Sequence, residues 1–201
     1  MKKIAITGVS NEKRLIMCNA LSNLTGFDVV RCTPYSGFSI KHSLDKKLKE
    51  YEWHELYSYI LHSFVERIDI ESSYDEYISN GSVFNELAFM EAMKVNPTFR
   101  KINTRNKKFL FMGDSLKSII SEYAQRYESI IHITCDSLNV NDFYIDKCLK
   151  TLIENCGVLH FIYGENALLD ILNNFSNIAG LKIAMPPLTA IRKAEIEFSE
   201  F

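Results

Sequence analysis

Short apolar runs alternate with helical patterns along the whole chain, and this alternation constrains the fold more than any other feature. The predicted strands, the last of them at a sheet edge, are residues 4–7, 27–32, 76–79, 129–135, 158–163 and 181–184. The predicted helices are residues 13–24, 44–67, 83–93, 116–127, 141–155 and 168–175. Strands joined through helices imply βαβ units, whose right-handed crossovers produce a parallel sheet. The sequence therefore predicts a three-layer α/β fold with helices on both faces of the sheet.

The length and composition are typical of one globular domain. The chain has 201 residues, of which 47% are hydrophobic and 24% are charged. We therefore expect a single domain over residues 1–201. Residues 186–201 predict a terminal amphipathic helix that docks on its own sheet or on a second subunit, as a homo-oligomer or with another protein.

Several features favour a cytoplasmic protein that does not bind membranes. No stretch approaches the roughly 20 apolar residues that cross a bilayer, and the apolar start breaks at Gly8, too early for a secretory signal. The 5 cysteines are scattered without metal-binding spacing, which is typical of reduced thiols. The net charge of −2 argues against general binding to nucleic acids or membrane surfaces.

The segment after the first predicted strand aligns with a phosphate-binding loop, in which G-x-x-x-x-G-K-[ST] surrounds phosphates with backbone N–H groups. Gly8 takes the first glycine position, while Lys13, Arg14 and Leu15 fall on Gly, Lys and Ser/Thr. Arg14 keeps the charge in a broader shape, and Leu15 removes the hydroxyl that binds magnesium. If the segment binds ATP or another nucleotide, its contacts come from Gly8, Val9, Ser10, Asn11, Lys13 and Arg14. The alternative is a surface turn that binds no nucleotide.

Two longer segments resemble a known group of proteins. The run ISNGSVFNELAFMEA at residues 78–92, within residues 52–92, and the segment 144–164 resemble small P-loop ATPases akin to the nicotinamide-ribonucleotide kinase domain. The resemblance implies a P-loop NTPase, nucleotide-kinase-like fold and an ATP-dependent phosphotransferase activity. It also implies an Asp at the end of the third strand, an arginine-bearing lid, and a ligand contact from Ser82.

The chain departs from that group at its catalytic positions. Asn80 stands at the implied Asp, and residues 136–142 (DSLNVND) contain no Lys or Arg. Phosphoryl transfer depends on cations at the developing charge, so these changes predict weak or absent catalysis. The catalytic residues stay unknown, with Arg14, Asn80 and Asp136 as candidates. We expect no intact magnesium site; Asp136 is the candidate ligand, and a helix cap is its alternative role.

Other candidate ligand contacts are positively charged or aromatic. Arg31 ends the second predicted strand and Tyr35 follows in a turn, which places both where substrate could bind. Arg67 with Glu66 and Glu71 either binds an acceptor or forms an exposed ion pair, and the exposed pair is the favoured interpretation.

Residues 94–108 form a basic segment with no acidic residue between Lys94 and Lys108, and residues 96–108 are predicted to be an exposed loop. This is either a solvated face or the contact for an acidic protein or nucleic acid, whose affinity would depend on salt.

Three functions therefore remain open from the sequence. The first is a kinase-like protein that binds a nucleotide or phosphorylated ligand with little or no catalysis. The second is a scaffold or interaction subunit that holds a protein or nucleic-acid partner. The third is a divergent, active nucleoside or nucleotide kinase.

Overall fold

The computed structural model describes residues 2–32, 53–95, 107–136, 138–164, 166–177 and 182–199. Its centre is a sheet in the order β2-β3-β1-β4-β5, in which every strand pair is parallel. The strands are β1 (Lys3–Thr7), β2 (Asp28–Arg31), β3 (Tyr77–Asn80), β4 (Ser129–Ile133) and β5 (Leu159–Tyr163).

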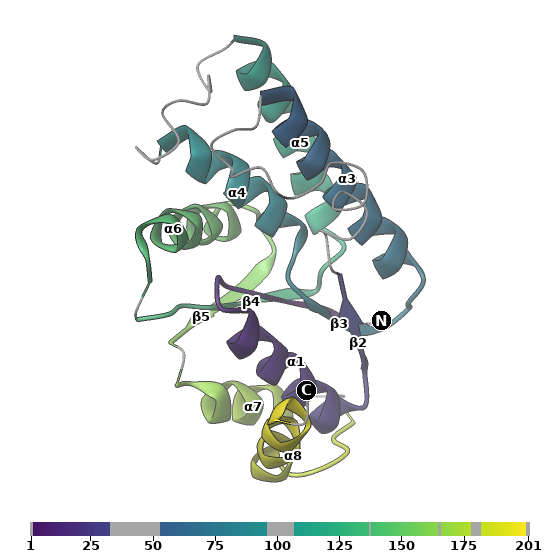
Figure 1. The fold of residues 1–201 in the computed structure, drawn as a ribbon. Coiled ribbons are helices and arrows are strands. Elements are labelled where there is room, and N and C mark those ends of the chain that lie inside the picture. The colour runs from purple at the N-terminus through teal and green to yellow at the C-terminus, as the bar shows by residue number, and fades with distance from the viewer. Residues whose placement is uncertain are drawn as a thin grey trace.

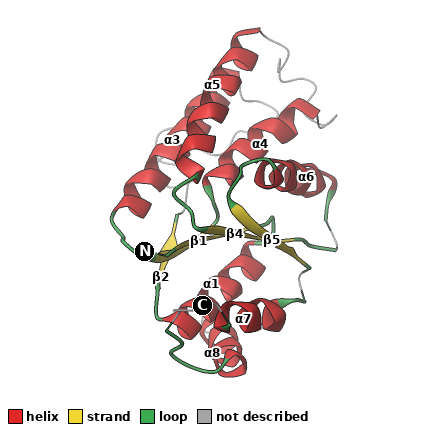
Figure 2. Cartoon of the chain, turned by 180° about the vertical axis from the view of Figure 1, so that it is seen from behind, coloured by secondary structure: helices red, strands yellow, loops and turns green. Residues whose placement is uncertain are grey.

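Helices cover both faces of this sheet (Figures 1 and 2). One face carries α3 (Trp53–Ser72), α4 (Val83–Val95), α5 (Lys107–Ala124) and α6 (Val140–Glu154). The other carries α1 (Asn11–Thr25), α7 (Leu168–Ser176) and α8 (Pro187–Ser199). The prediction of a three-layer α/β fold is confirmed.

Alternation along the strands assigns their side chains to two cores. Ala5 of β1 and Ile130 of β4 belong to the cluster beneath α3 to α6. Ile4, Ile6 and Ile131 belong to the cluster over α1, α7 and α8. Successive residues of a strand point to opposite faces of the sheet. Because both faces are buried here, the strands are continuous apolar runs in the sequence.

The central position of β1 places the following turn at the carboxyl edge of the sheet. β1 lies between β3 and β4, and the chain turns after Thr7 into α1. This is the arrangement of an open, parallel α/β sheet, and ligands in such sheets bind at this edge.

Some predicted boundaries were wrong. Helix α3 continues past Arg67 to Ser72, and α5 begins at Lys107 instead of residue 116. Residues 182–184 form no strand, because the Ala184 N–H donates to the Leu24 carbonyl at the end of α1 (2.7 Å) instead of to a strand. Residues 44–52 of the predicted long helix lie outside the described residues.

The terminal helix packs on the helical layer of its own chain. Ala190 and Ala194 of α8 are fully buried, and α8 lies against α1 (Figure 1). Such small residues allow two helices to approach closely. The predicted docking on the chain's own sheet is therefore corrected to docking on α1 and α7, while a second subunit stays a prediction.

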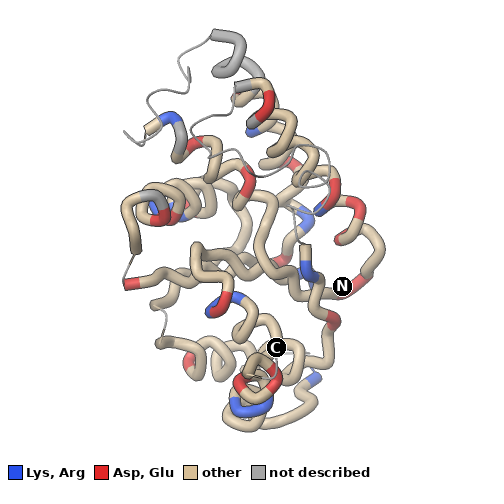
Figure 3. The backbone as a smooth tube through the Cα atoms, in the orientation of Figure 1, with Lys and Arg blue, Asp and Glu red and all other residues tan. Residues whose placement is uncertain are grey.

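The outer surface carries charges of both signs. Figure 3 shows acidic and basic positions interspersed along the described helices. Within the described parts of the chain, no helix is both long enough and apolar enough to cross a membrane.

Candidate functional site

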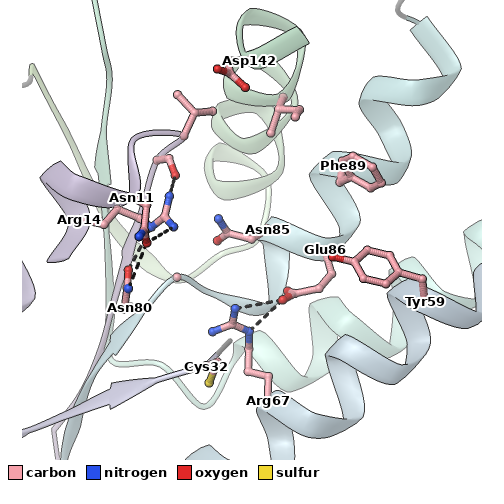
Figure 4. A pocket seen from close by; sticks show the side chains of 14 residues that line it. Asn11, Arg14, Cys32, Tyr59, Arg67, Asn80, Asn85, Glu86, Phe89 and Asp142 are labelled. Carbon is pink, nitrogen blue, oxygen red and sulfur yellow. Dashed lines mark hydrogen bonds and ion pairs between the residues drawn. The ribbon is translucent and has the colours of Figure 1, made fainter. Parts of the chain in front are cut away.

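A cavity of about 530 Å³ lies at the carboxyl edge of the sheet. The turn after β1, the end of β3 and helices α3, α4 and α6 all contribute to its wall (Figure 4). The lining residues are Gly8, Val9, Asn11, Arg14, Cys32, Tyr59, Arg67, Asn80, Gly81, Asn85, Glu86, Phe89, Asp142 and Ile145.

The turn between β1 and α1 is short and held tightly. Gly8 has φ +139°, and a Cβ there would lie 2.4 Å from the Ile133 carbonyl oxygen, so β4 leaves no room for a side chain. Ser10 caps α1 by accepting the Lys13 N–H on Oγ (3.3 Å). Because α1 begins at Asn11, Lys13 and Arg14 lie in its first turn, and the Arg14 N–H already binds the Ser10 carbonyl (3.1 Å).

The Arg14 guanidinium links this turn to the end of β3. Its Nε donates to Asn80 Oδ1 and its Nη2 donates to Asn11 Oδ1, both at 3.1 Å. Its Nη1 donates to the Gly8 carbonyl. A planar fork can reach several acceptors at fixed angles, which the compact lysine ammonium cannot reproduce. Asn80, at the position where the resemblance implied an Asp, therefore acts as a partner of Arg14.

A buried ion pair forms the inner end of the cavity. Arg67 is 2% exposed and Glu86 is 6% exposed. Arg67 Nη2 and Nε donate to Glu86 Oε1 at 2.9 and 3.2 Å (Figure 4). Burial raises the pKa of the Glu86 carboxyl, and the attraction of Arg67 opposes that shift. The favoured interpretation of Arg67 as part of an exposed ion pair was wrong, because α3 turns it toward α4 under the protein surface.

Glu71 is a second buried carboxylate beside Arg67. Its carboxylate accepts hydrogen bonds from Ser79 Oγ (2.6 Å), Tyr127 OH (3.0 Å) and Tyr77 OH (3.1 Å). Burial raises the pKa of Tyr77 and Tyr127, so both phenols remain neutral donors. Arg67 Nη1 lies 3.7 Å from Glu71 Oε1, which joins the two carboxylates through one guanidinium.

Cys32 also lines the cavity, but its thiol is a poor nucleophile. Burial raises the pKa of its thiol to about 11, with Arg67 opposing that shift. The thiolate is the nucleophilic form of cysteine. A thiol that stays protonated at neutral pH is therefore a wall of this cavity and not a reacting group.

The structure brings together only part of the predicted nucleotide contacts. Gly8, Val9, Asn11 and Arg14 line the cavity together with Asn80. Ser10 instead caps the helix. Lys13 lines a second cavity of about 290 Å³ between α1 and α8, away from this site.

The predicted substrate and metal contacts lie apart from the cavity wall. Arg31 is exposed at the end of β2, opposite Asn80 in register. Ser82 is buried, and its Oγ accepts the Phe84 N–H at the start of α4 (3.2 Å). Asp136 is exposed after β4 and does not line the cavity. Tyr35 lies outside the described residues.

The remaining predictions concern metals and the basic segment. Across the described ranges, no group of three or more His, Cys, Asp or Glu side chains is arranged to hold a metal ion. Residues 96–106 of the basic segment lie outside those ranges. Lys94 ends α4 in an ion pair with Glu91 (2.7 Å), and Lys107 and Lys108 begin α5, where an exposed loop was expected.

Sequence reasoning missed Asn85, Glu86 and Phe89. A signal for Glu86 was present, because it follows Val83 by three residues and precedes Met90 by four on the apolar side of α4. A charged residue in the buried stripe of a helix needs a partner. The partner itself, Arg67, is visible only when α3 and α4 are packed together.

Comparisons with known proteins add little to this description. No family model matches the chain, and no curated protein matches it. Among solved structures, it is similar to deoxyadenosine kinase from M. mycoides, a structure with the products dCMP and a flexible dCDP bound. The two chains share 10% identity over 98% of each, with a TM-score of 0.47. The fold assignment therefore rests on the strand order and layers of this chain.

Proposed function

We propose that this protein binds a nucleotide or another phosphorylated ligand in the cavity at the sheet edge and transfers no phosphoryl group. The cavity of about 530 Å³ has the size of a small-molecule site. It also lies at the carboxyl ends of parallel strands, where such folds bind their ligands.

The observation that carries the proposal is the placement of Arg14. Its guanidinium borders the cavity and is oriented by Asn80, Asn11 and the Gly8 carbonyl. The other arginine in the wall, Arg67, is buried against the Glu86 carboxylate at the inner end of the cavity. Arginine binds phosphate well, and the N-terminus of α1 adds its partial positive charge. Arg14 is therefore the cation that we expect a phosphate to meet.

The same neighbourhood offers little for phosphoryl transfer. The helix α1 has Leu15 where a magnesium-binding hydroxyl would stand, and β3 ends in the neutral Asn80. The connection over residues 136–142 contains no Lys or Arg to stabilise a transferring phosphoryl group. Since catalysis of this reaction comes mainly from cations and positioning, binding without turnover follows.

Calorimetry with ATP, ADP, GTP and AMP, with and without magnesium, tests the proposal. We expect binding that depends little on magnesium, with negligible hydrolysis. Because a hydrogen bond to a charged group contributes about 1.5–3 kcal/mol, Arg14→Ala should weaken binding by at least about tenfold. Arg192→Ala, an exposed arginine of α8 that does not line the cavity, is the matched control and should bind as the parent does.

Two results would overturn the proposal, each in favour of another function. Magnesium-dependent turnover of ATP that is lost in Arg14→Ala or Asp136→Ala would indicate a divergent kinase. No binding to any nucleotide of the panel would favour an interaction subunit, whose partner should then be found by co-purification.

A further inference from the structure

One oxygen of Glu86 is left without a partner at the inner end of the cavity. The Glu86 side chain is 4% exposed, and Arg67 holds its Oε1 through two N–H groups. Among the described residues, Oε2 has no hydrogen-bond partner although it is buried. Leaving a buried acceptor unsatisfied costs about 1–3 kcal/mol, and more when the group is charged. Glu86 lines the cavity, so its unpaired oxygen indicates a place for a ligand donor beside it.

The charges around Glu86 specify the kind of group that fits. Glu86 and Glu71 contribute two carboxylates, while Arg67 contributes one guanidinium between them. Both carboxylates are nearly inaccessible to water, so their negative charge is poorly screened. An anionic ligand group would be repelled here, and an N–H donor would be attracted. The phosphate end of a ligand therefore belongs near Arg14, and a donor end belongs near Glu86.

Two aromatic rings form the adjoining wall. Tyr59 of α3 and Phe89 of α4 line the cavity beside Glu86 (Figure 4). Their ring centroids lie 6.3 Å apart with an interplanar angle of 74°. Edge and face contacts of this kind favour a flat aromatic ligand over an aliphatic one. Asn85, next to Glu86 in α4, also reaches the cavity wall.

We propose that the Glu86 end of the cavity binds a heteroaromatic ring carrying an exocyclic amino group, which donates a hydrogen bond to Glu86 Oε2. This specificity rests on the proposed function, because it assigns the second end of the same phosphorylated ligand. Arg67 acts as a positioning residue, since its two hydrogen bonds to Oε1 fix the direction of Oε2.

The test compares ligands in which an exocyclic amino group is replaced by an oxo group and the adjacent ring nitrogen gains a hydrogen: AMP with IMP, and CMP with UMP. The parent protein should bind the amino member of at least one pair about tenfold or more tightly, because an oxo group cannot donate to Oε2. In Glu86→Gln, the amide oxygen can accept from Arg67, so the amide NH₂ replaces Oε2. A donor then stands where an acceptor stood, and the preference should reverse toward IMP or UMP.

Glu91→Gln provides a matched control, because Glu91 lies on α4, pairs with Lys94 and does not line the cavity. It should keep the parent preference. Equal affinity for amino and oxo ligands in the parent would overturn the specificity and leave the proposed function standing. An unchanged ratio in a Glu86→Gln protein with parent-like circular dichroism would overturn it as well. If that variant does not fold, the ratio of the parent's affinities for the amino and oxo ligands decides. A parent that binds no nucleotide overturns both proposals.

Discussion

The turn between β1 and α1 and the buried cluster of Arg67, Glu71 and Glu86 lie on the same cavity but are built in opposite ways. The side chain of Arg14 in the first is half-buried, and two of its three described acceptors, Gly8 and Asn11, are near it in sequence. Arg67 in the second is 2% exposed and joins α3 to α4. The turn is recognisable as a motif, whereas the cluster has no motif at all.

This difference decides how much each region contributes to stability. An ion pair that water screens contributes little, but a buried charge that loses its partner costs several kcal/mol. The Arg14 side chain can therefore change with less effect on the fold than the cluster. The arginine that looks functional in the sequence is the more tolerant of the two.

The largest expected effect is that of Arg67→Ala. It leaves Glu86 and Glu71 as buried carboxylates without their guanidinium, which should lower the free energy of unfolding by about 3–5 kcal/mol. Urea unfolding followed by circular dichroism measures this loss. The exposed Arg192→Ala should change stability by less than about 0.5 kcal/mol. A loss below about 1 kcal/mol for Arg67→Ala would show that water reaches the cluster.

A second comparison uses two glycines with positive φ. Gly157→Ala (φ +75°) adds a Cβ into open space and should cost about 1–2 kcal/mol from its left-handed conformation. Gly8→Ala (φ +139°) adds a Cβ 2.4 Å from the Ile133 carbonyl oxygen, so the backbone of β4 or the turn must also move. Thermal unfolding should show the greater loss for Gly8→Ala. Equal losses would mean that the turn relaxes without disturbing the sheet.

The cap of α1 should have a smaller effect. Ser10→Ala removes the acceptor of the Lys13 N–H and should cost about 1 kcal/mol. Ser118→Ala removes an exposed hydroxyl on α5 and is the control, with an expected change below about 0.5 kcal/mol. If the two variants unfold at the same denaturant concentration, the cap contributes nothing to holding the turn.

The pH dependence of stability gives the smallest expected effect. Burial raises the pKa of Glu86 above its ordinary value of 4.5 despite the attraction of Arg67, so the folded state binds its proton more tightly than the unfolded state. Its contribution is then fully present below pH 4.5 and is lost as the pH rises through the folded-state pKa. As the pH rises above 4.5, the parent should therefore lose stability relative to Glu86→Gln. If the parent instead gains stability relative to Glu86→Gln as the pH rises, the pKa of Glu86 is lowered in the folded state and not raised.

Much of the fold was predictable because it depends on short-range patterns. Apolar runs of strand length and helical spacing placed all five strands of the described sheet within a few residues of their positions. The predicted strand at residues 181–184 failed because the Ala184 N–H binds the end of α1, a contact with residue 24 that no local pattern contains. The early start of α5 was missed because basic residues at 107 and 108 read as a continuation of the loop.

Only the part of the candidate site at the β1–α1 turn and the end of β3 was predictable. Gly8, Asn11, Arg14 and Asn80 stand beside strand ends, and parallel strands bring such ends to one edge. Arg67 was read as exposed because charged residues near a helix end usually are. Its burial depends on α4, which places Glu86 against Arg67 across 19 residues of sequence.

The sequence by itself determined the parallel sheet, the position of the β1–α1 turn and the missing hydroxyl and carboxylate at Leu15 and Asn80. These follow from residue type and periodicity, which act over a few residues. Only the tertiary structure decided that Arg14 is held by Asn80 and that Glu86 is buried with one oxygen unpartnered. Burial and hydrogen bonding depend on which elements pack together, and α1, β3, α3 and α4 meet only in the folded chain.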